Sequence, residues 1–349
     1  MVPTSLPDTH RRWQADQLGD PAAVLRLGTG PLPVPGPGET LVAVQAAGVN
    51  FADGLLCEGS YQHPADPPLT PGIEVAGVVA GGDLPPGVAA GARVVDTTVP
   101  GRGAWAGYAL ARTAHLFPVA DDVDDVTAAA SHVVFQTAWV ALVIRARLQP
   151  GDWVVVQGAG GATGGAAVQV ATALGARVIA VAGGRAKTAA AAAAGAEVVL
   201  DHRSVDVVAA VGEATGGRGA DVAYDPVGAA TLETSRRSLG TGGRLVVVGF
   251  ASGGPAPQIP ANKLLVRNHD AIGVAWPAWR DHDPTGVADA QRAIDTRLAN
   301  GTFRPDIAGV RPLDEALDAL VDLRAGTTVG KWVIAQPGAS HTPPAAADR

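Results

Sequence analysis

The middle third of the chain alternates short apolar runs with segments of helix length or with turn-rich segments. This alternation is typical of strands joined by helices, which assemble into a parallel, doubly wound sheet. We therefore predict an α/β fold with such a sheet here. Its expected strands are WVVVQ (153–157), RVIAVA (177–182), EVVLD (197–201), DVAYD (221–225), RLVVVGF (244–250) and DAIGVAW (270–276).

The first third has a different texture, rich in Gly, Pro and Val. Its β-type runs ETLVAVQAAGV (39–49) and GIEVAGVVAGG (72–82) are separated by Pro- and Gly-rich turns, which indicates a compact, mostly β domain. A long helical run, TAAASHVVFQTAWVALVIRA (127–146), then leads into the α/β domain.

The last part of the chain is expected to pack back onto the first domain. Two helical patterns precede a closing strand, GKWVIA (330–335), and the end of the chain is polar and rich in Pro and Ala. We predict a first domain at 1–122, an α/β domain at 123–276, a return to the first domain at 277–336 and a mobile tail at 337–349.

Composition narrows the choice of partners. The net charge of -7 gives no long-range attraction to nucleic acid or anionic lipid. Cys57 is the only cysteine, which excludes an internal disulfide and a cysteine-rich zinc lobe. We find no N-terminal leader and no apolar stretch of about 18 residues. We therefore predict a cytoplasmic protein that binds small molecules or proteins rather than membranes or nucleic acid.

A glycine-rich turn, QGAGGATGG, follows the first strand of the α/β domain. Glycines three residues apart let a strand turn sharply into a helix and let backbone amides approach a pyrophosphate, whose charge the helix dipole favours. The order of strand, turn and apolar helix predicts a dinucleotide site. Its expected residues are Gly158, Gly160, Gly161, Ala162, Thr163 and Gly164.

The end of the second strand favours NADP(H). Enzymes of this fold that use NAD usually place an acidic residue there to bind the ribose hydroxyls, whereas this chain continues with Gly183 and Gly184. Arg185 and Lys187 follow at once, and Arg203 comes directly after the third strand, so positive charge surrounds the expected place of a 2′-phosphate. The alternative is that these are ordinary surface charges.

Several stretches together resemble the medium-chain dehydrogenase/reductase superfamily, and most of all its zinc-independent quinone oxidoreductases. They include GETLVAVQAAGVNFAD, GSY, LTPGIEVAGVV, VVVQGAGGATGGAAVQVATALGARVIAVAG, DPVG, VVVGFASG and VGKWVIA, and they run from about Arg12 to Gln336. The resemblance implies a GroES-like catalytic domain and a Rossmann domain, with the active site between them.

The resemblance also bears on metal chemistry. Zinc members of the superfamily carry Cys at the place of Asn50, His at the place of Ile73 and Cys near Val133, and catalytic zinc needs about three protein ligands. Without that Lewis acid, alcohol oxidation loses its usual electrophile. A quinone or an α,β-unsaturated carbonyl delocalises the incoming charge, so hydrogen-bond donors suffice. We predict an NADPH-dependent oxidoreductase without zinc that transfers hydride to such an acceptor.

The resemblance further implies roles for single residues. Tyr61 matches a tyrosine near the nicotinamide that donates a proton or hydrogen bond to a developing enolate, although a packing role is the alternative. Asn50 matches an asparagine whose amide contacts the nicotinamide ribose or the substrate oxygen. Lys331 stands where relatives carry a cation near the pyrophosphate, with a solvated lysine before an edge strand as the alternative. His202 stands where a tyrosine is often found. The remaining implied cofactor contacts are Thr137, Gly249, Phe250, Val274 and Ala275.

Two other functions stay open from the sequence. One is an enoyl-thioester reductase in a biosynthetic pathway, acting on an acyl-CoA or an acyl carrier. The other is a low-turnover NADPH-binding protein with a structural or RNA-binding role. The run at 270–276 matches an edge strand through which relatives pair their sheets, so we also expect a homodimer.

Overall fold

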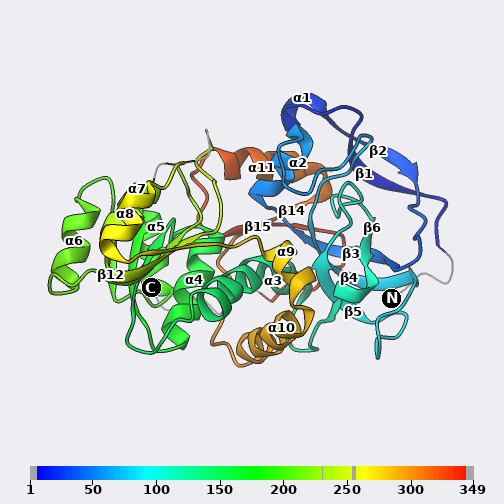
Figure 1. Ribbon diagram of the computed structural model, residues 1–349. Coiled ribbons are helices and arrows are strands. Elements are labelled where there is room, and N and C mark those ends of the chain that lie inside the picture. Colours follow the sequence, from blue (N-terminus) through cyan, green and yellow to red (C-terminus); the bar gives the residue numbers. More distant parts are fainter. Residues whose placement is uncertain (1–5, 230, 254–256, 343–349) are drawn as a thin grey trace. The chain divides into compact units, whose positions relative to one another are not determined.

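The computed structural model describes residues 6–229, 231–253 and 257–342. It divides the chain into two compact units, shown in Figure 1. Unit 1 comprises residues 1–133 and 307–349, and unit 2 comprises residues 134–306. Unit 1 is thus built from both ends of the chain.

Unit 1 is organised around a mostly antiparallel seven-stranded sheet in the order β14-β15-β3-β4-β5-β7, with β6 also paired to β3. Alternate residues of β3, such as Val42 and Val44, are buried in its core together with Trp105. The strands are β3 (Glu39–Gly48), β4 (Glu74–Gly82), β5 (Arg93–Thr97), β6 (Tyr108–Arg112), β7 (Phe117–Pro118), β14 (Ile307–Pro312) and β15 (Lys331–Ala335).

A hairpin and a few short helices complete unit 1. The hairpin pairs β1 (Thr9–Ala15) with β2 (Leu25–Pro31). Helix α2 is capped at its C-terminus by Gly59, whose φ of 71° is the left-handed conformation in which glycine is favoured. The helices are α1 (Pro21–Val24), α2 (Phe51–Glu58) and α11 (Ala316–Arg324), with 3₁₀ turns η1 (Thr113–His115) and η3 (Leu313–Glu315).

Unit 2 contains a six-stranded, fully parallel sheet in the order β10-β9-β8-β11-β12-β13. Numbered from β8, this order is 3-2-1-4-5-6, the Rossmann order. The predicted fold class is therefore confirmed. The strands are β8 (Trp153–Gln157), β9 (Arg177–Ala182), β10 (Val198–Asp201), β11 (Ala220–Asp225), β12 (Leu239–Val247) and β13 (Asp270–Gly273).

Helices lie between these strands and after the last of them. They are α4 (Ala162–Ala173), α5 (Arg185–Ala193), α6 (Val207–Ala214), α7 (Leu232–Ser238), α8 (Ala261–Arg267), α9 (Trp276–His282) and α10 (Pro284–Ala299). The predicted strand 270–276 is shorter than expected, because it ends at Gly273 and α9 begins at Trp276. Pro277 follows in the first turn, where proline's fixed φ suits a helix start.

The return to unit 1 comes later than the expected residue 277. Helix α10 belongs to unit 2, where Gln136 donates a 2.7 Å hydrogen bond to Gln291. Phe135 also stacks on Phe303, with ring centroids 4.7 Å apart. These buried contacts hold the segment before residue 307 to unit 2, and the chain re-enters unit 1 with β14.

Helix α3 (Asp125–Trp139) continues as a π-helix, η2 (Val140–Arg145). Within the described residues, 125–145 is long and apolar enough to cross a membrane by length and composition, contrary to our expectation of no such stretch. Because 67% of its apolar window is buried inside the protein, the run has the character of a core helix.

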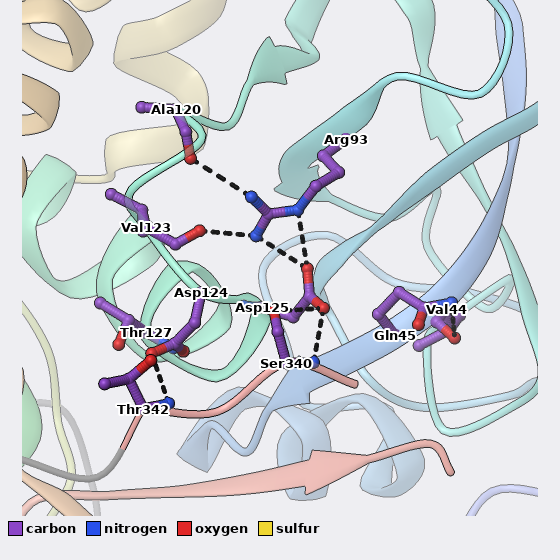
Figure 2. Close-up of polar contacts among 10 residues, drawn as sticks. All are labelled: Val44, Gln45, Arg93, Ala120, Val123, Asp124, Asp125, Thr127, Ser340 and Thr342. Atoms are coloured by element: carbon purple, nitrogen blue, oxygen red, sulfur yellow. Dashed lines mark hydrogen bonds and ion pairs between the residues drawn. The ribbon is translucent and has the colours of Figure 1, made fainter. Parts of the chain in front are cut away.

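The mobility of the tail at 337–349 stays a prediction, and its described residues Ser340 and Thr342 contact the start of α3. Figure 2 shows Asp125, at the start of α3, held from one side by Arg93 and from the other by Ser340. The Ser340 hydroxyl donates to Asp125 Oδ2 at 2.8 Å and accepts from the Asp125 amide at 3.0 Å. The Thr342 amide donates to Asp124 at 2.9 Å. The tail therefore caps otherwise free amides of α3, and residues 343–349 lie outside the described part.

Candidate functional site

In unit 2, most of the predicted cofactor residues follow the carboxyl ends of strands. Because all six strands are parallel, these ends share one edge of the sheet, and such folds bind nucleotides where the strand order reverses, here between β8 and β11. The turn 158–164 follows β8, Gly183 follows β9, His202 and Arg203 follow β10, Gly249 and Phe250 follow β12, and Val274 and Ala275 follow β13.

The glycine turn has no room for larger residues at two of its positions. A Cβ at Gly164 would overlap the Gly158 carbonyl oxygen, and one at Gly160 would overlap the Lys187 side chain. Gly158 has a φ of 61°, and its carbonyl accepts the Gly161 amide at 3.0 Å. Backbone thus packs closely on backbone here, as a turn that brings its amides to a pyrophosphate requires.

Helix α4 begins directly after this turn. Its N-cap is Gly161, which has no side chain to bond the first amides, and Ala162 and Thr163 form the first turn. Amides of a first helical turn point along the axis without intrahelical partners, and the helix dipole adds positive potential. A dinucleotide pyrophosphate fits this end of α4.

Two cations lie against the turns that follow β8 and β9. A Cβ at Gly184 would lie 2.9 Å from Arg203 Nη1 and one at Gly183 3.1 Å from Arg203 Nε, so the guanidinium covers this backbone. Lys187 packs on Gly160, and its pKa is lowered by burial and by the charge of Arg203. Two positive groups held this close favour a bound anion.

Asp201 fixes the backbone beneath these cations. At the end of β10, its carboxylate accepts the Gly184 amide at 3.1 Å and the Arg203 amide at 3.0 Å. The hydrogen bond from Arg203 is the largest cause that lowers the pKa of Asp201. This carboxylate therefore holds two loops together.

A second close-packed corner joins the loops after β11 and β12. Asp225, fully buried at the end of β11, accepts from the amides of Val227 and Gly228 and from the hydroxyls of Thr231 and Ser235. Gly228 has a φ of 86°, and a Cβ there would lie 2.6 Å from the Phe250 ring. These contacts position the predicted segment 249–250, and the sequence reading had overlooked Asp225.

In unit 1, Asn50 belongs to a polar group that we call the Asn50 cluster: Asn50, Asp53, Glu74 and Lys331. The Lys331 ammonium lies 2.5 Å from Asn50 Oδ1 and 2.7 Å from Glu74 Oε2, with Lys331 3% exposed and Glu74 fully buried. A Cβ at Gly48 would overlap Glu74 Oε2, so glycine is needed for this close approach. The contact of Lys331 with a pyrophosphate stays a prediction.

The Asn50 cluster determines which way the Asn50 amide faces. Lys331 is only a donor, and Glu74 accepts from Asn50 Nδ2 at 3.0 Å, so Oδ1 must face the ammonium and Nδ2 the carboxylate. Nδ2 also donates to the Gly48 carbonyl at 3.1 Å. Both amide hydrogens are therefore used inside unit 1.

Asp53 anchors the start of α2. It accepts from the amides of Asn50 at 2.8 Å, Gly72 at 3.0 Å and Ile73 at 2.8 Å. Burial raises the pKa of Asp53 to about 6, against the lowering effect of these hydrogen bonds. Asp53 and Glu74 were not identified from the sequence, although the spacing of Asn50 and Asp53 at a helix start and the single acid in the apolar run IEVAGVV were available as signals.

The three positions that correspond to zinc ligands in relatives all lie around this cluster. Asn50 binds Lys331, the Ile73 amide binds Asp53, and the Val133 amide donates to Glu74 Oε1 at 2.8 Å. Ile73 and Val133 have hydrocarbon side chains, which offer a metal no ligand atom. Among the residues that the structure describes, no group of three or more His, Cys, Asp or Glu is arranged to hold a metal.

Tyr61 lies in unit 1 just beyond the end of α2 and is half-buried. Its amide donates to the Leu55 carbonyl at 3.2 Å, and its ring meets His63 edge to face, with centroids 5.7 Å apart. The helix end thus fixes the backbone of Tyr61. Thr137 is half-buried on α3 in unit 2. The catalytic role of Tyr61 and the cofactor contact of Thr137 stay predictions.

Comparison with known proteins agrees with this architecture. Residues 36–121 match the family described as the alcohol dehydrogenase GroES-like domain, and residues 162–290 match the zinc-binding dehydrogenase family. The quinone oxidoreductase-like protein 2 of Bos taurus is 36% identical over 301 residues, which is 85% of each chain.

Solved structures agree as well. Escherichia coli quinone oxidoreductase complexed with NADPH superposes with a TM-score of 0.84 at 27% identity, covering 93% of this chain and 99% of that one. A mycobacterial structure complexed with NADPH superposes with a TM-score of 0.85 at 31% identity, with the same coverage. The chain therefore belongs to the medium-chain dehydrogenase/reductase superfamily of oxidoreductases, in its quinone oxidoreductase-like branch.

Proposed function

We propose that the protein is an NADPH-dependent reductase that works without zinc and transfers hydride to a quinone or an α,β-unsaturated carbonyl. The observation that carries this proposal is the pair of cations, Arg203 and Lys187, packed over the glycine turns of a Rossmann edge. A relative named quinone oxidoreductase-like protein 2 supports it, as do two similar structures solved with NADPH, one of which is a quinone oxidoreductase.

Bound NADPH supplies the hydride, and the chain's own residues hold the cofactor. The turn 158–164 and the first turn of α4 bind the pyrophosphate, while Arg203, Lys187 and Arg185 bind the 2′-phosphate. The close-packed corner at Gly228 and Phe250 supports the loop assigned to the nicotinamide end. Each of these segments lies at the carboxyl edge of one sheet, which supports a single extended dinucleotide site.

The residues assigned to the substrate favour an acceptor that stabilises its own charge. Ile73 and Val133 offer no metal ligand, so hydrogen bonds must stabilise the developing oxyanion. We assign the proton or hydrogen bond to the Tyr61 hydroxyl. To Asn50, whose amide hydrogens are occupied, we assign an acceptor role toward a ribose hydroxyl.

The site assigned to the 2′-phosphate is tested by comparing NADPH with NADH in an Arg203 variant. We expect Arg203→Ser to raise the KM for NADPH by about 10- to 100-fold, as expected for a lost hydrogen bond to a charged group of about 1.5–3 kcal/mol, and to leave NADH kinetics unchanged. Arg177→Ser is the matched control, because Arg177 lies at the amino end of β9, whereas the expected cofactor residues follow the carboxyl ends of the strands. Equal losses with both cofactors would refute the assignment.

Substrate class is tested with Tyr61→Phe and an acceptor panel. With a quinone, a simple enone and an enoyl-CoA, we expect turnover of the quinone or the enone, and a kcat about 10²-fold lower in Tyr61→Phe, the lower end for a general acid. Preference for the enoyl-CoA would favour an enoyl-thioester reductase. Tight NADPH binding without turnover of any acceptor would favour the structural or RNA-binding alternative.

We further propose a cytoplasmic homodimer that pairs through the free edge of β13. Two exposed apolar side chains on the neighbouring α8 support the dimer: Leu265 is 79% exposed and Val266 72%. The cytoplasmic location is supported by Cys57, a lone and buried free thiol, which fits a reducing compartment. Sedimentation of wild type and Leu265→Lys tests the dimer, and cell fractionation tests the location. A monomeric wild type would refute the pairing.

A further inference from the structure

The π-helix η2 sits at the end of α3, just before the Rossmann sheet begins. The Ala146 amide bonds the Ala141 carbonyl, five residues back, at 2.9 Å. A π turn inserts one residue into a helix and so rotates every following side chain around the axis, and such turns are frequent at functional sites. The residue that this rotation directs is Arg145, the last of η2.

Arg145 makes two contacts with the segment that follows β13. Its Nη1 donates to the Gly273 carbonyl at 3.0 Å, and its guanidinium lies 4.7 Å from the centre of the Trp279 ring. Gly273 is the last residue of β13, and Trp279 is in the first turns of α9. One side chain therefore spans the whole connection from strand to helix.

The Gly273 carbonyl faces the free edge of the sheet. The Val274 amide bonds the Val247 carbonyl of β12 at 2.9 Å, and successive residues of a parallel strand point their polar groups to opposite sides. The Gly273 carbonyl must then point away from β12, to the side on which β13 has no neighbouring strand in the part of the chain that the structure describes. Arg145 satisfies this edge carbonyl, which closes the end of β13 to pairing with another strand.

Helix α9 needs such an anchor. It has seven residues, too few to be stable in isolation, and it begins after the two residues Val274 and Ala275. Its first residue, Trp276, is 3% exposed and holds the start of the helix in unit 2. Arg145 fixes the next turn through Trp279, so the path of 274–279 is determined from both sides.

We infer that Arg145 is a positioning residue, which holds Val274, Ala275 and the start of α9 in place for hydride transfer. The inference rests on the proposed function, in which this segment lies beside the nicotinamide. Arg145 acts through Gly273 and Trp279 and has no contact with the reacting atoms in this assignment. An edge closed at Gly273 also confines any dimer pairing to the earlier residues of β13.

The test compares Arg145→Met with Arg145→Lys, and with Arg147→Met as the matched control. Arg147 lies two residues away, is exposed, and serves its neighbours through its carbonyl oxygen, which a substitution keeps. In cofactor-free protein we expect amides of 274–283 to exchange hydrogen about tenfold faster in Arg145→Met, as expected when a hydrogen bond and a cation–π contact are lost. Arg145→Lys should recover part of the protection.

In single-turnover assays we expect hydride transfer to be about tenfold slower in Arg145→Met, with the Kd for NADPH changed less than about twofold. Misplacing the segment 274–279 affects only the nicotinamide end of the cofactor and leaves the contacts with the rest of it in place. Unchanged hydrogen exchange, or equal effects in Arg147→Met, would overturn the anchoring. Faster exchange with normal hydride transfer would overturn the positioning role. If the wild type fails to oxidise NADPH with every acceptor tested, the proposed function is wrong. The hydrogen-exchange experiment would still decide whether Arg145 anchors the segment.

Discussion

Replacing Lys331 with Met tests the Asn50 cluster most sharply. The substitution keeps a chain of similar length and removes the ammonium that lies 2.7 Å from Glu74 Oε2 and 2.5 Å from Asn50 Oδ1. Glu74 is fully buried, so its carboxylate would lose its cation without gaining water. The Val133 backbone amide and the Asn50 side-chain amide would remain as donors to Glu74.

The magnitude follows from this geometry. Removing one partner of a buried ion pair costs about 3–5 kcal/mol, and the two remaining donors to Glu74 place the expected loss near 3 kcal/mol. Adding Glu74→Gln removes the uncompensated charge, so the double variant should be more stable than the sum of the single losses predicts, by about 2 kcal/mol. The exposed pair Arg11 and Asp314, 2.7 Å apart in the same unit, provides the control.

The assay is urea unfolding followed by circular dichroism, with the m-value compared between variants so that midpoints report stability. Arg11→Met should cost less than about 1 kcal/mol, as is usual for exposed pairs. The reasoning is refuted if Lys331→Met costs no more than Arg11→Met, or if the losses in the double variant simply add.

Three further predictions concern other parts of the chain. Gly164→Ala should weaken NADPH binding and lower the melting temperature, because its Cβ would overlap backbone. Gly161→Ala should keep the melting temperature, because its Cβ would meet only an ordinary contact at 3.5 Å. Equal melting temperatures in the two variants would contradict this prediction. Ser340→Ala should lose about 1 kcal/mol of unfolding free energy in urea titrations, as for a lost helix cap, while Thr342→Val, which keeps the bonded amide, should lose little. His10 has a pKa lowered by burial, and also by Arg12, from 6.5 to about 4. The unfolded chain therefore binds the proton first, and stability should fall as the pH drops from about 6.5 toward 4; unfolding midpoints at pH 7 and 5 should differ more in wild type than in His10→Gln.

The sequence predicted best where local pattern decides structure. The run WVVVQ gave β8 with both of its ends correct, because a continuous apolar run stands between the turn residues PGD and a glycine. The segment WPAWRDHD gave no signal for α9, since this short helix depends on the distant Arg145 rather than on an apolar period. The predicted strand 270–276 overran Gly273 for the same reason.

Site residues followed the same division. The glycine turn could be recognised because its chemistry lies within seven consecutive residues. Lys331 was expected to serve the pyrophosphate, and its partners Glu74 and Asn50 come from distant parts of the sequence, so no local pattern indicated the pairing. Asp225 was missed because its partners, two amides and two hydroxyls, become a cluster only when the loop after β11 folds over it.

The central claim is that the protein works without zinc and uses NADPH to reduce only acceptors that delocalise their incoming charge. The most direct measurement is the kcat/KM for NADPH oxidation with an enone and with its saturated ketone, on protein whose zinc content has been determined by elemental analysis. The account predicts turnover of the enone, no turnover of the ketone, and zinc far below one ion per chain. Turnover of the ketone by protein that holds one zinc per chain would contradict it.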